Sequence, residues 1–137
     1  MYLHEMNERQ RREEENFVEK LKQSNWDTEP FASLLHDGTY VSPEGNASLK
    51  TDDVELTLEY YAEEESFVLV IFSPKEGTMI RLKFLFGSHF EQVLDWVVTR
   101  QQELNLKSFP KLLKKVYAYC DIILLLEKDG TAHRIEI

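Results

Sequence analysis

The sequence lacks most of the residues that mark a secreted, membrane-spanning or zinc-binding protein. One cysteine, Cys120, occurs in 137 residues, which excludes an intramolecular disulfide and a cysteine-based zinc cluster. The longest apolar runs, Phe67–Phe72 and Ile122–Leu126, are far shorter than the ~20 residues of a membrane helix. The polar N-terminus has no apolar signal-peptide core. These absences predict a cytoplasmic protein that does not enter a membrane.

Catalytic and metal-binding motifs are missing as well. The five glycines are scattered as turn residues and form no phosphate loop or nucleophile elbow. The four histidines lie too far apart for the common zinc spacings. Cys120 follows an expected helix and precedes Asp121, where the negative end of the helix dipole opposes thiolate formation. We therefore predict no catalytic residue, no metal site and no cofactor.

Positive charge is scarce, since 16 Lys and Arg stand against 25 Asp and Glu for a net charge of −9. A protein that coats nucleic acid needs a basic surface, so the composition disfavours that class. The acidity is concentrated in residues 52–65, which hold seven acidic residues and no basic one. They are Asp52, Asp53, Glu55, Glu59, Glu63, Glu64 and Glu65. Neighbouring like charges cost stability, so we expect a docking surface for a protein partner, best matched by a basic one. Ordinary solvation of an exposed strand is the alternative.

A basic segment and a tryptophan are further candidates for partner contact. Residues 100–115 hold five basic residues against one acidic residue. The basic residues are Arg100, Lys107, Lys111, Lys114 and Lys115. The lysines are candidates to contact an anion or a partner, or they form the solvated face of a helix. Trp96 falls on the flank of the preceding helix and is a candidate interface anchor, with packing in the core as the alternative.

The rest of the sequence can build a core, because 42% of residues are hydrophobic and 12% are aromatic. Helix-forming residues predict a helix over 4–25, and residues 1–16 have few apolar anchors and are expected to project or fray. A short second helix is expected after Pro30. Alternating apolar residues predict strands at 54–61, 67–72 and 80–86, joined in an antiparallel meander. The wholly apolar middle strand is typical of one covered on both faces.

The C-terminal third predicts two more helices, at 90–104 and 110–120, and then a hairpin of strands at 122–126 and 131–137. The predicted fold is one α+β domain over residues 1–137. It has an antiparallel sheet of about five strands, with N-terminal helices and a helical pair inserted before the last hairpin.

These features favour a non-enzymatic protein-binding or regulatory domain, of the inhibitor, immunity or assembly-factor type. The alternative is a small enzyme or small-molecule-binding domain, with a pocket between sheet and helices lined by His36, Tyr40, Tyr60 or His89. A third hypothesis is a homo-oligomer that associates through the N-terminal helix or the last edge strand.

Overall fold

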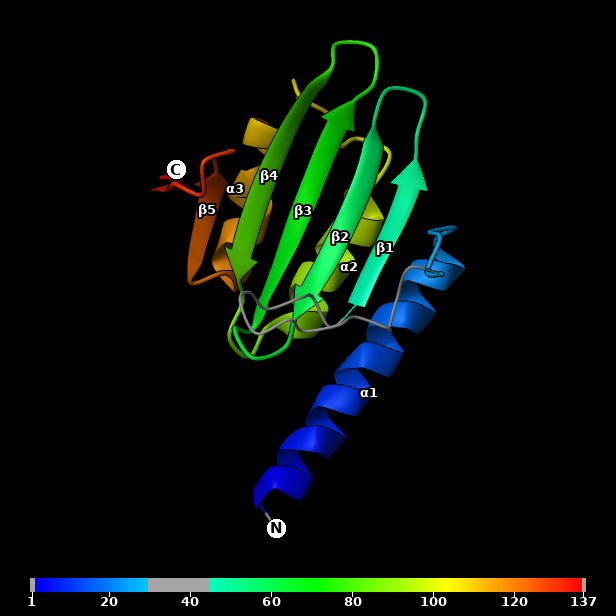
Figure 1. The fold of residues 1–137 in the computed structure, drawn as a ribbon, viewed down its shortest axis with the longest axis vertical. Coiled ribbons are helices and arrows are strands. Elements are labelled where there is room, and N and C mark those ends of the chain that lie inside the picture. Colours follow the sequence, from blue (N-terminus) through cyan, green and yellow to red (C-terminus); the bar gives the residue numbers. More distant parts are fainter. Residues whose placement is uncertain (1, 30–44, 137) are drawn as a thin grey trace.

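The chain forms three α-helices and six strands within the residues that the computed structural model describes, 2–29 and 45–136. The side chains of residues 2–7 and 10 are outside the description, and so is the short helix expected after Pro30. The elements are α1 (Tyr2–Gln23), β1 (Gly45–Lys50), β2 (Glu55–Tyr61), β3 (Ser66–Ser73), β4 (Thr78–Leu85), α2 (Phe90–Arg100), α3 (Phe109–Val116), the 3-10 helix η1 (Tyr117–Tyr119), β5 (Ile122–Leu126) and β6 (Ala132–Arg134) (Figure 1).

The six strands form one sheet in which each strand pairs with the next along the chain. Every pairing from β1 to β6 is antiparallel. β4 and β5 are neighbours in the sheet although α2, α3 and η1 separate them in the sequence. The structure therefore confirms the predicted α+β fold, with the helical pair inserted before the last hairpin.

The sheet has one strand more than the sequence pattern predicts, namely β1. Its sequence, GNASLK, has no β-branched or aromatic residue, and Gly, Asn and Ser are more typical of turns. Tertiary pairing nevertheless forms the strand, because Ala47 lies opposite Leu58 and Leu49 lies opposite Leu56 in β2. Two apolar side chains that point into the core are enough to place a short strand at the sheet edge.

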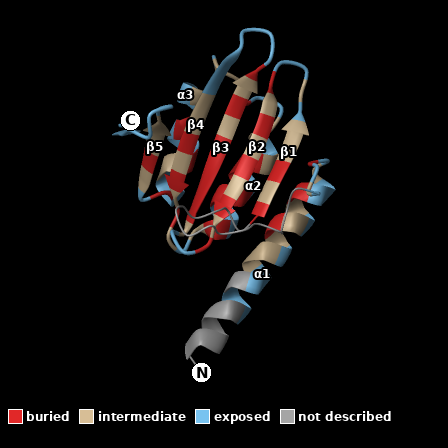
Figure 2. Cartoon of the chain, in the orientation of Figure 1, coloured by how far each residue is buried: buried red, intermediate tan, exposed pale blue. Residues whose placement is uncertain are grey.

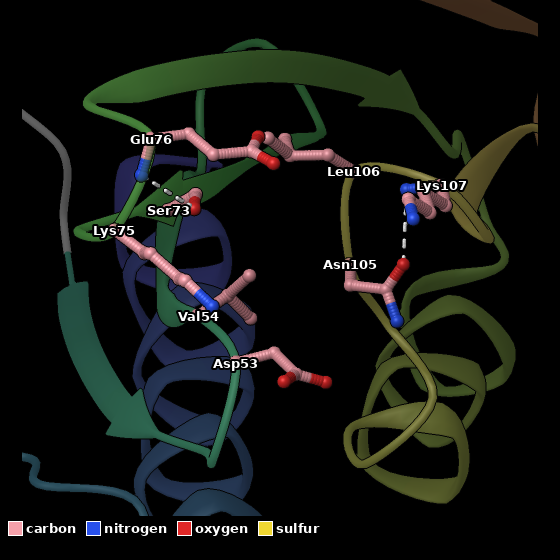
Figure 3. Close-up of a pocket in the computed structure, with 8 residues that line it drawn as sticks. All are labelled: Asp53, Val54, Ser73, Lys75, Glu76, Asn105, Leu106 and Lys107. Atoms are coloured by element: carbon pink, nitrogen blue, oxygen red, sulfur yellow. Dashed lines mark hydrogen bonds between the residues drawn. The ribbon is translucent and has the colours of Figure 1, made fainter.

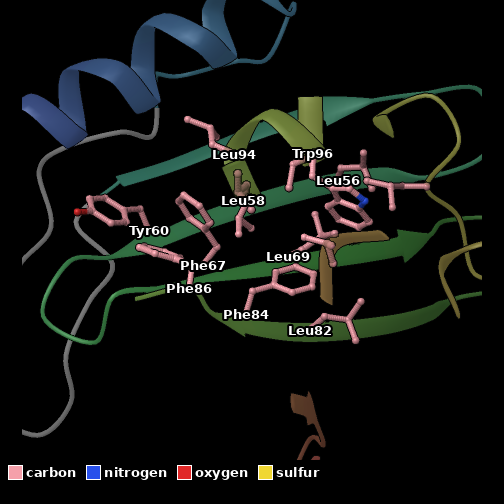
Figure 4. Packing of buried hydrophobic residues seen from close by; sticks show 14 of the residues in the cluster. Leu56, Leu58, Tyr60, Phe67, Leu69, Leu82, Phe84, Phe86, Leu94 and Trp96 are labelled. Carbon is pink, nitrogen blue, oxygen red and sulfur yellow. The ribbon is translucent and has the colours of Figure 1, made fainter. Parts of the chain in front are cut away.

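α2 and α3 lie behind the strands in the view of Figure 1, and α1 packs Phe17 against Tyr60 and Phe67 on the same face of the sheet. An aromatic cluster centred on Phe67 joins the two layers (Figure 4). The ring centroid of Phe67 lies 5.9 Å from that of Phe17, 5.7 Å from Tyr60, 4.7 Å from Phe86 and 5.2 Å from Phe90. Because Phe17 belongs to α1 and Phe90 to α2, this one cluster holds both helices to the sheet.

Burial alternates along the strands, as the banding in Figure 2 shows. In β2 every second residue, Leu56, Leu58 and Tyr60, is fully buried beneath the helices. A period of two is the pattern of a strand whose two faces meet different environments. The residues between them point to the opposite face of the sheet, which is called the outer face below.

The first turns of α1 extend beyond the end of the sheet in Figure 1. Phe17 and Leu21 are buried in the core, so the C-terminal half of α1 is the docked half. Polar contacts reach further toward the N-terminus, since the hydroxyl of Tyr60 donates a hydrogen bond to the carboxylate of Glu13. Arg9 Nη1 lies 4.0 Å from Glu65 Oε2, so α1 contacts the β2–β3 turn as well as the core.

Replacing Phe67 by alanine tests the aromatic cluster. Phe67 is fully buried, so we expect Phe67→Ala to lower the free energy of unfolding by about 3–5 kcal/mol in a urea titration. Tyr119→Ala is the control, because Tyr119 is 41% exposed and its loss is expected to cost about 1 kcal/mol or less. Equal losses in the two variants would contradict the central role of Phe67.

Candidate functional site

The outer face of the sheet carries side chains in strips that follow the strands. Strand β2 contributes an acidic strip, with Glu55 and Glu59 pointing outward. The outward residues of β5 are apolar, and so are those of β3 apart from Ser66 at its start; β4 contributes Arg81 and Lys83 between them. The apolar outward residues of β3 and β5 are Val68, Val70, Phe72, Ile122, Leu124 and Leu126.

The register of the sheet aligns these strips into rows. Glu59 lies opposite Val68, Val68 opposite Lys83, and Lys83 opposite Leu124. The order across the outer face, from β2 to β5, is therefore acidic, apolar, basic and apolar. Glu59 and Lys83 are two strands apart, which at ~4.8 Å per strand is roughly 10 Å.

The predicted acidic residues follow β2 from end to end. Asp52 and Asp53 lie in the β1–β2 turn, and residues 63–65 lie in the β2–β3 turn at the opposite end of the strand. The seven residues of β2 span roughly 20 Å between the two turns. The acidic residues therefore form one long strip and not a compact cluster.

Basic residues offset part of this strip. Lys50 Nζ lies 3.6 Å from Glu55 Oε1, and Lys83 Nζ lies 2.8 Å from both carboxylate oxygens of Glu64. Together with the Arg9–Glu65 contact, these pairs balance three of the seven acidic residues. Exposed pairs of this kind contribute ~1 kcal/mol or less each to stability. Their main effect is to reduce the negative electrostatic potential around the strip.

Glu59 sits at the centre of the strip and has a neutral partner. The hydroxyl of Tyr61 donates a hydrogen bond to Glu59 Oε1 over 3.0 Å. Partial burial, followed by the charge of Glu59 and this hydrogen bond, raises the pKa of Tyr61 above its usual range, while Arg81 acts in the opposite direction. A carboxylate accepts hydrogen bonds at both oxygens, so Glu59 has capacity for a further donor.

The apolar run Phe67–Phe72 within β3 has different surroundings on its two faces. Its composition predicts cover on both faces, yet the described helices lie on one face only. On the outer face Val68 is 3% exposed, whereas Val70 and Phe72 are half-buried. Met79, opposite Phe72 in β4, is 50% exposed. In the sequence, the signal for this apolar surface was the unbroken apolar run of β3. The distribution of charge alone did not indicate it.

The basic segment is divided between α2, α3 and the loop that joins them. Lys111, Lys114 and Lys115 are exposed on α3, which lies on the helical side of the sheet. Arg100 Nη1 lies 3.3 Å from Glu103 Oε2. Lys107 belongs to the loop and does not join the three α3 lysines. The acidic strip and the α3 lysines therefore face opposite sides of the molecule.

Trp96 lies in the core and is not an exposed anchor. It is 7% exposed, and its ring packs edge-on against Phe84 with the centroids 5.8 Å apart. The helical spacing could have shown this, because Trp96 is three residues after Val93, which is fully buried on the inner face of α2. Its indole nitrogen is buried without a hydrogen-bond partner, which costs stability.

A cavity of about 320 Å³ lies at the end of the sheet where the β1–β2 and β3–β4 turns meet the loop after α2 (Figure 3). Its lining residues are Asp53, Val54, Ser73, Lys75, Glu76, Asn105, Leu106 and Lys107. Asn105 Oδ1 is engaged by the backbone N–H groups of Lys107 and Ser108, at 2.9 and 3.0 Å. The cavity therefore has a structured polar wall with charges of both signs.

The expected pocket between sheet and helices is filled by core side chains where the structure describes it. Tyr60 is fully buried, and burial, followed by the bond to Glu13, raises the pKa of its hydroxyl above the usual range. His89 lies at the start of α2, with its ring centroid 5.9 Å from that of Tyr119. His36 and Tyr40 are outside the described residues.

Neither a metal site nor a membrane span occurs in the part of the chain that the structure describes. There, no group of three or more His, Cys, Asp or Glu side chains is placed to hold a metal ion. No helix within residues 2–29 and 45–136 combines the length and the hydropathy needed to cross a bilayer. Comparison with protein-family models, with curated proteins and with solved structures found no significant match.

The reactivity of Cys120 tests its burial. Desolvation, with the Asp121 carboxylate adding to it, raises the pKa of the Cys120 thiol to about 12 from 9.0. Since the thiolate is the reactive form, we expect the folded chain to react with an aromatic disulfide reagent on the order of a thousand-fold more slowly than the unfolded chain. Comparable rates before and after adding denaturant would show that the thiol is accessible and ionised.

The raised pKa values of Tyr60 and Tyr61 predict a loss of stability at alkaline pH. Both groups have an ordinary pKa of 10.0 and a higher one in the folded chain. Their contribution is complete below pH 10 and is lost as pH rises further, because the unfolded state releases protons that the folded state retains. Urea titrations across this range should show a shallower decline for Tyr60→Phe than for the natural chain. An identical decline in both would exclude Tyr60 as the cause.

Proposed function

We propose that the chain is a non-enzymatic protein-binding domain that presents the outer face of its sheet to a protein partner. The observation that carries this proposal is the composition of β3 and β5. Strands that are apolar on both faces are typical of sheets covered on both sides, and the described helices cover one side. An apolar strip flanked by charge, as β3 is by Glu59 and Lys83, is characteristic of a protein interface.

The acidic strip beside this surface indicates which kind of partner it would select. Charges at the border of an interface raise the association rate and select against partners of the wrong sign more than they add affinity. Glu55 and Glu59 border the apolar strip of β3, so they favour a partner whose basic residues lie beside an apolar surface. A cytoplasmic inhibitor, immunity protein or assembly factor would use a face of this kind.

Small-molecule binding is a second candidate function, and the cavity lined by Asp53 and Lys107 favours it. Its size lies at the lower end of the ~300–1,000 Å³ typical of ligand pockets. Such pockets are mostly apolar, however, and here Val54 and Leu106 supply the apolar lining among charged and polar residues. Chemical-shift perturbation of Asn105 and Lys107 in a screen of small zwitterions would test this candidate.

The protein-binding proposal is tested by neutralising the strip and comparing what the chain captures. We expect the triple variant Glu55→Gln, Glu59→Gln, Glu63→Gln to recover any specific partner at least about ten-fold less than the natural chain, in affinity capture with quantitative mass spectrometry. The matched control makes the same change of charge on the helical side, with Glu91→Gln, Asp95→Asn and Glu103→Gln, and should retain the partner.

The informative result is a difference in partner recovery between the natural chain and the strip variant. Capture of a protein by the natural chain alone does not test the proposal. A partner that binds the strip variant and the natural chain equally at low salt would contradict the proposal. Loss of the partner from both variants would place the binding surface elsewhere.

A further inference from the structure

We infer that the partner of the outer face is a second copy of this chain, bound face to face about a two-fold axis parallel to β3. The inference rests on the proposed function, because it names the partner for the same surface. It follows from the order of the strips on β2, β3 and β4, which is self-complementary about β3.

The symmetry can be followed strand by strand. β2 and β4 flank β3 on either side. A two-fold axis along β3, lying between two facing sheets, turns the second copy over, so β3 faces β3 and β2 faces β4 of the other copy. The acidic strip of each copy then meets the basic strip of the other, while the half-buried Val70 and Phe72 meet their own symmetry mates.

The rows of the sheet identify the residues that meet. An axis parallel to the strands keeps each row opposite itself, so Glu59 faces Lys83 of the second copy, and Lys83 faces its Glu59. Arg81 shares a row with Thr57 and Val70, so it lies across from Thr57, between Glu55 and Glu59 of the second copy. Facing sheets pack ~10 Å apart, a gap that long charged side chains can bridge.

These side chains keep unused hydrogen-bonding capacity in the single chain. Lys83 Nζ carries three donors, and two positions are directed at the carboxylate oxygens of Glu64, each 2.8 Å away. Glu59 uses one oxygen for the hydroxyl of Tyr61. The third donor of Lys83 and the second oxygen of Glu59 can therefore pair across the interface without breaking either internal bond.

The size of the face suits a dimer. The five strands β1 to β5, spaced by ~4.8 Å and about seven residues long on average, cover roughly 24 by 23 Å in projection, or close to 600 Å². This area of about 600 Å² is of the same order as the ~800 Å² that each partner buries in a standard protein interface. The accessible area exceeds the projection because the side chains corrugate the surface.

The edges of the sheet are less suited to self-association than its face. Asp27 exchanges two backbone hydrogen bonds with Ser48, at 2.7 and 2.9 Å, and so occupies the free edge of β1. The strand at the other edge, β6, has three residues, which is short for a strand that pairs with another chain. The edges therefore favour the face as the interface.

A charge-exchange experiment tests the arrangement with purified protein. The natural chain should sediment at twice its mass of 16.2 kDa. Glu59→Lys and Lys83→Glu each place like charges opposite one another twice per dimer, so each variant alone should dissociate roughly a hundred-fold more readily. Mixing the two should restore the dimer, because every facing pair is then of opposite sign. Lys111→Glu, an equal change of charge on α3, should leave the natural dimer intact.

The outcomes separate this inference from the proposed function. A natural chain that stays at 16.2 kDa up to its solubility limit would overturn self-association, while strip-dependent capture of another protein would still support the protein-binding proposal. Variants that dimerise as well as the natural chain, or a mixture that stays monomeric while both variants show the natural circular dichroism and melting temperature, would overturn the face-to-face arrangement.

Discussion

The aromatic packing around Phe67 is the constraint on which the remaining structure depends. Phe17 from α1 and Phe90 from α2 meet on this ring, so the cluster decides which face of the sheet the helices cover. Burial of rings this large dominates the energetics of a small core. The described helices cover one face, so the apolar residues of β3 and β5 that point the other way have no cover from these helices.

The charges are arranged around this asymmetry. The acidic residues follow β2 on the outer side, whereas Lys111, Lys114 and Lys115 are exposed on the helical side. A net charge of −9 therefore conceals a molecule with two electrostatically different sides. The orientation of a protein in a complex depends on such differences more than on its total charge.

The sequence predicts the fold well where its patterns are strong and local. The alternation in β2, the apolar runs of β3 and β5, and the helical periodicity of α2 all correspond to elements of the structure. β1 could not be predicted, because its small polar residues become a strand only by pairing with β2. The burial of Trp96 could be predicted from its helical spacing to Val93. The alignment of Glu59 with Lys83, by contrast, depends on strand register. Register is a tertiary property, so the candidate site could be predicted as a set of acidic residues but not as an ordered surface.

The connection between β4 and β5 has a consequence for how the molecule is assembled. β1 to β4 are joined by short turns, so their pairing closes small loops. Leu85 and Ile122, by contrast, pair only after the segment that holds α2, α3 and η1 has been closed into a loop. Closing that larger loop costs more chain entropy and slows the step. We therefore expect the meander to form early and β5 to be added once α2 and α3 have docked. The apolar strip of β5 would then join the outer face only when the domain is complete, which limits the apolar surface that a partly folded chain exposes to other chains.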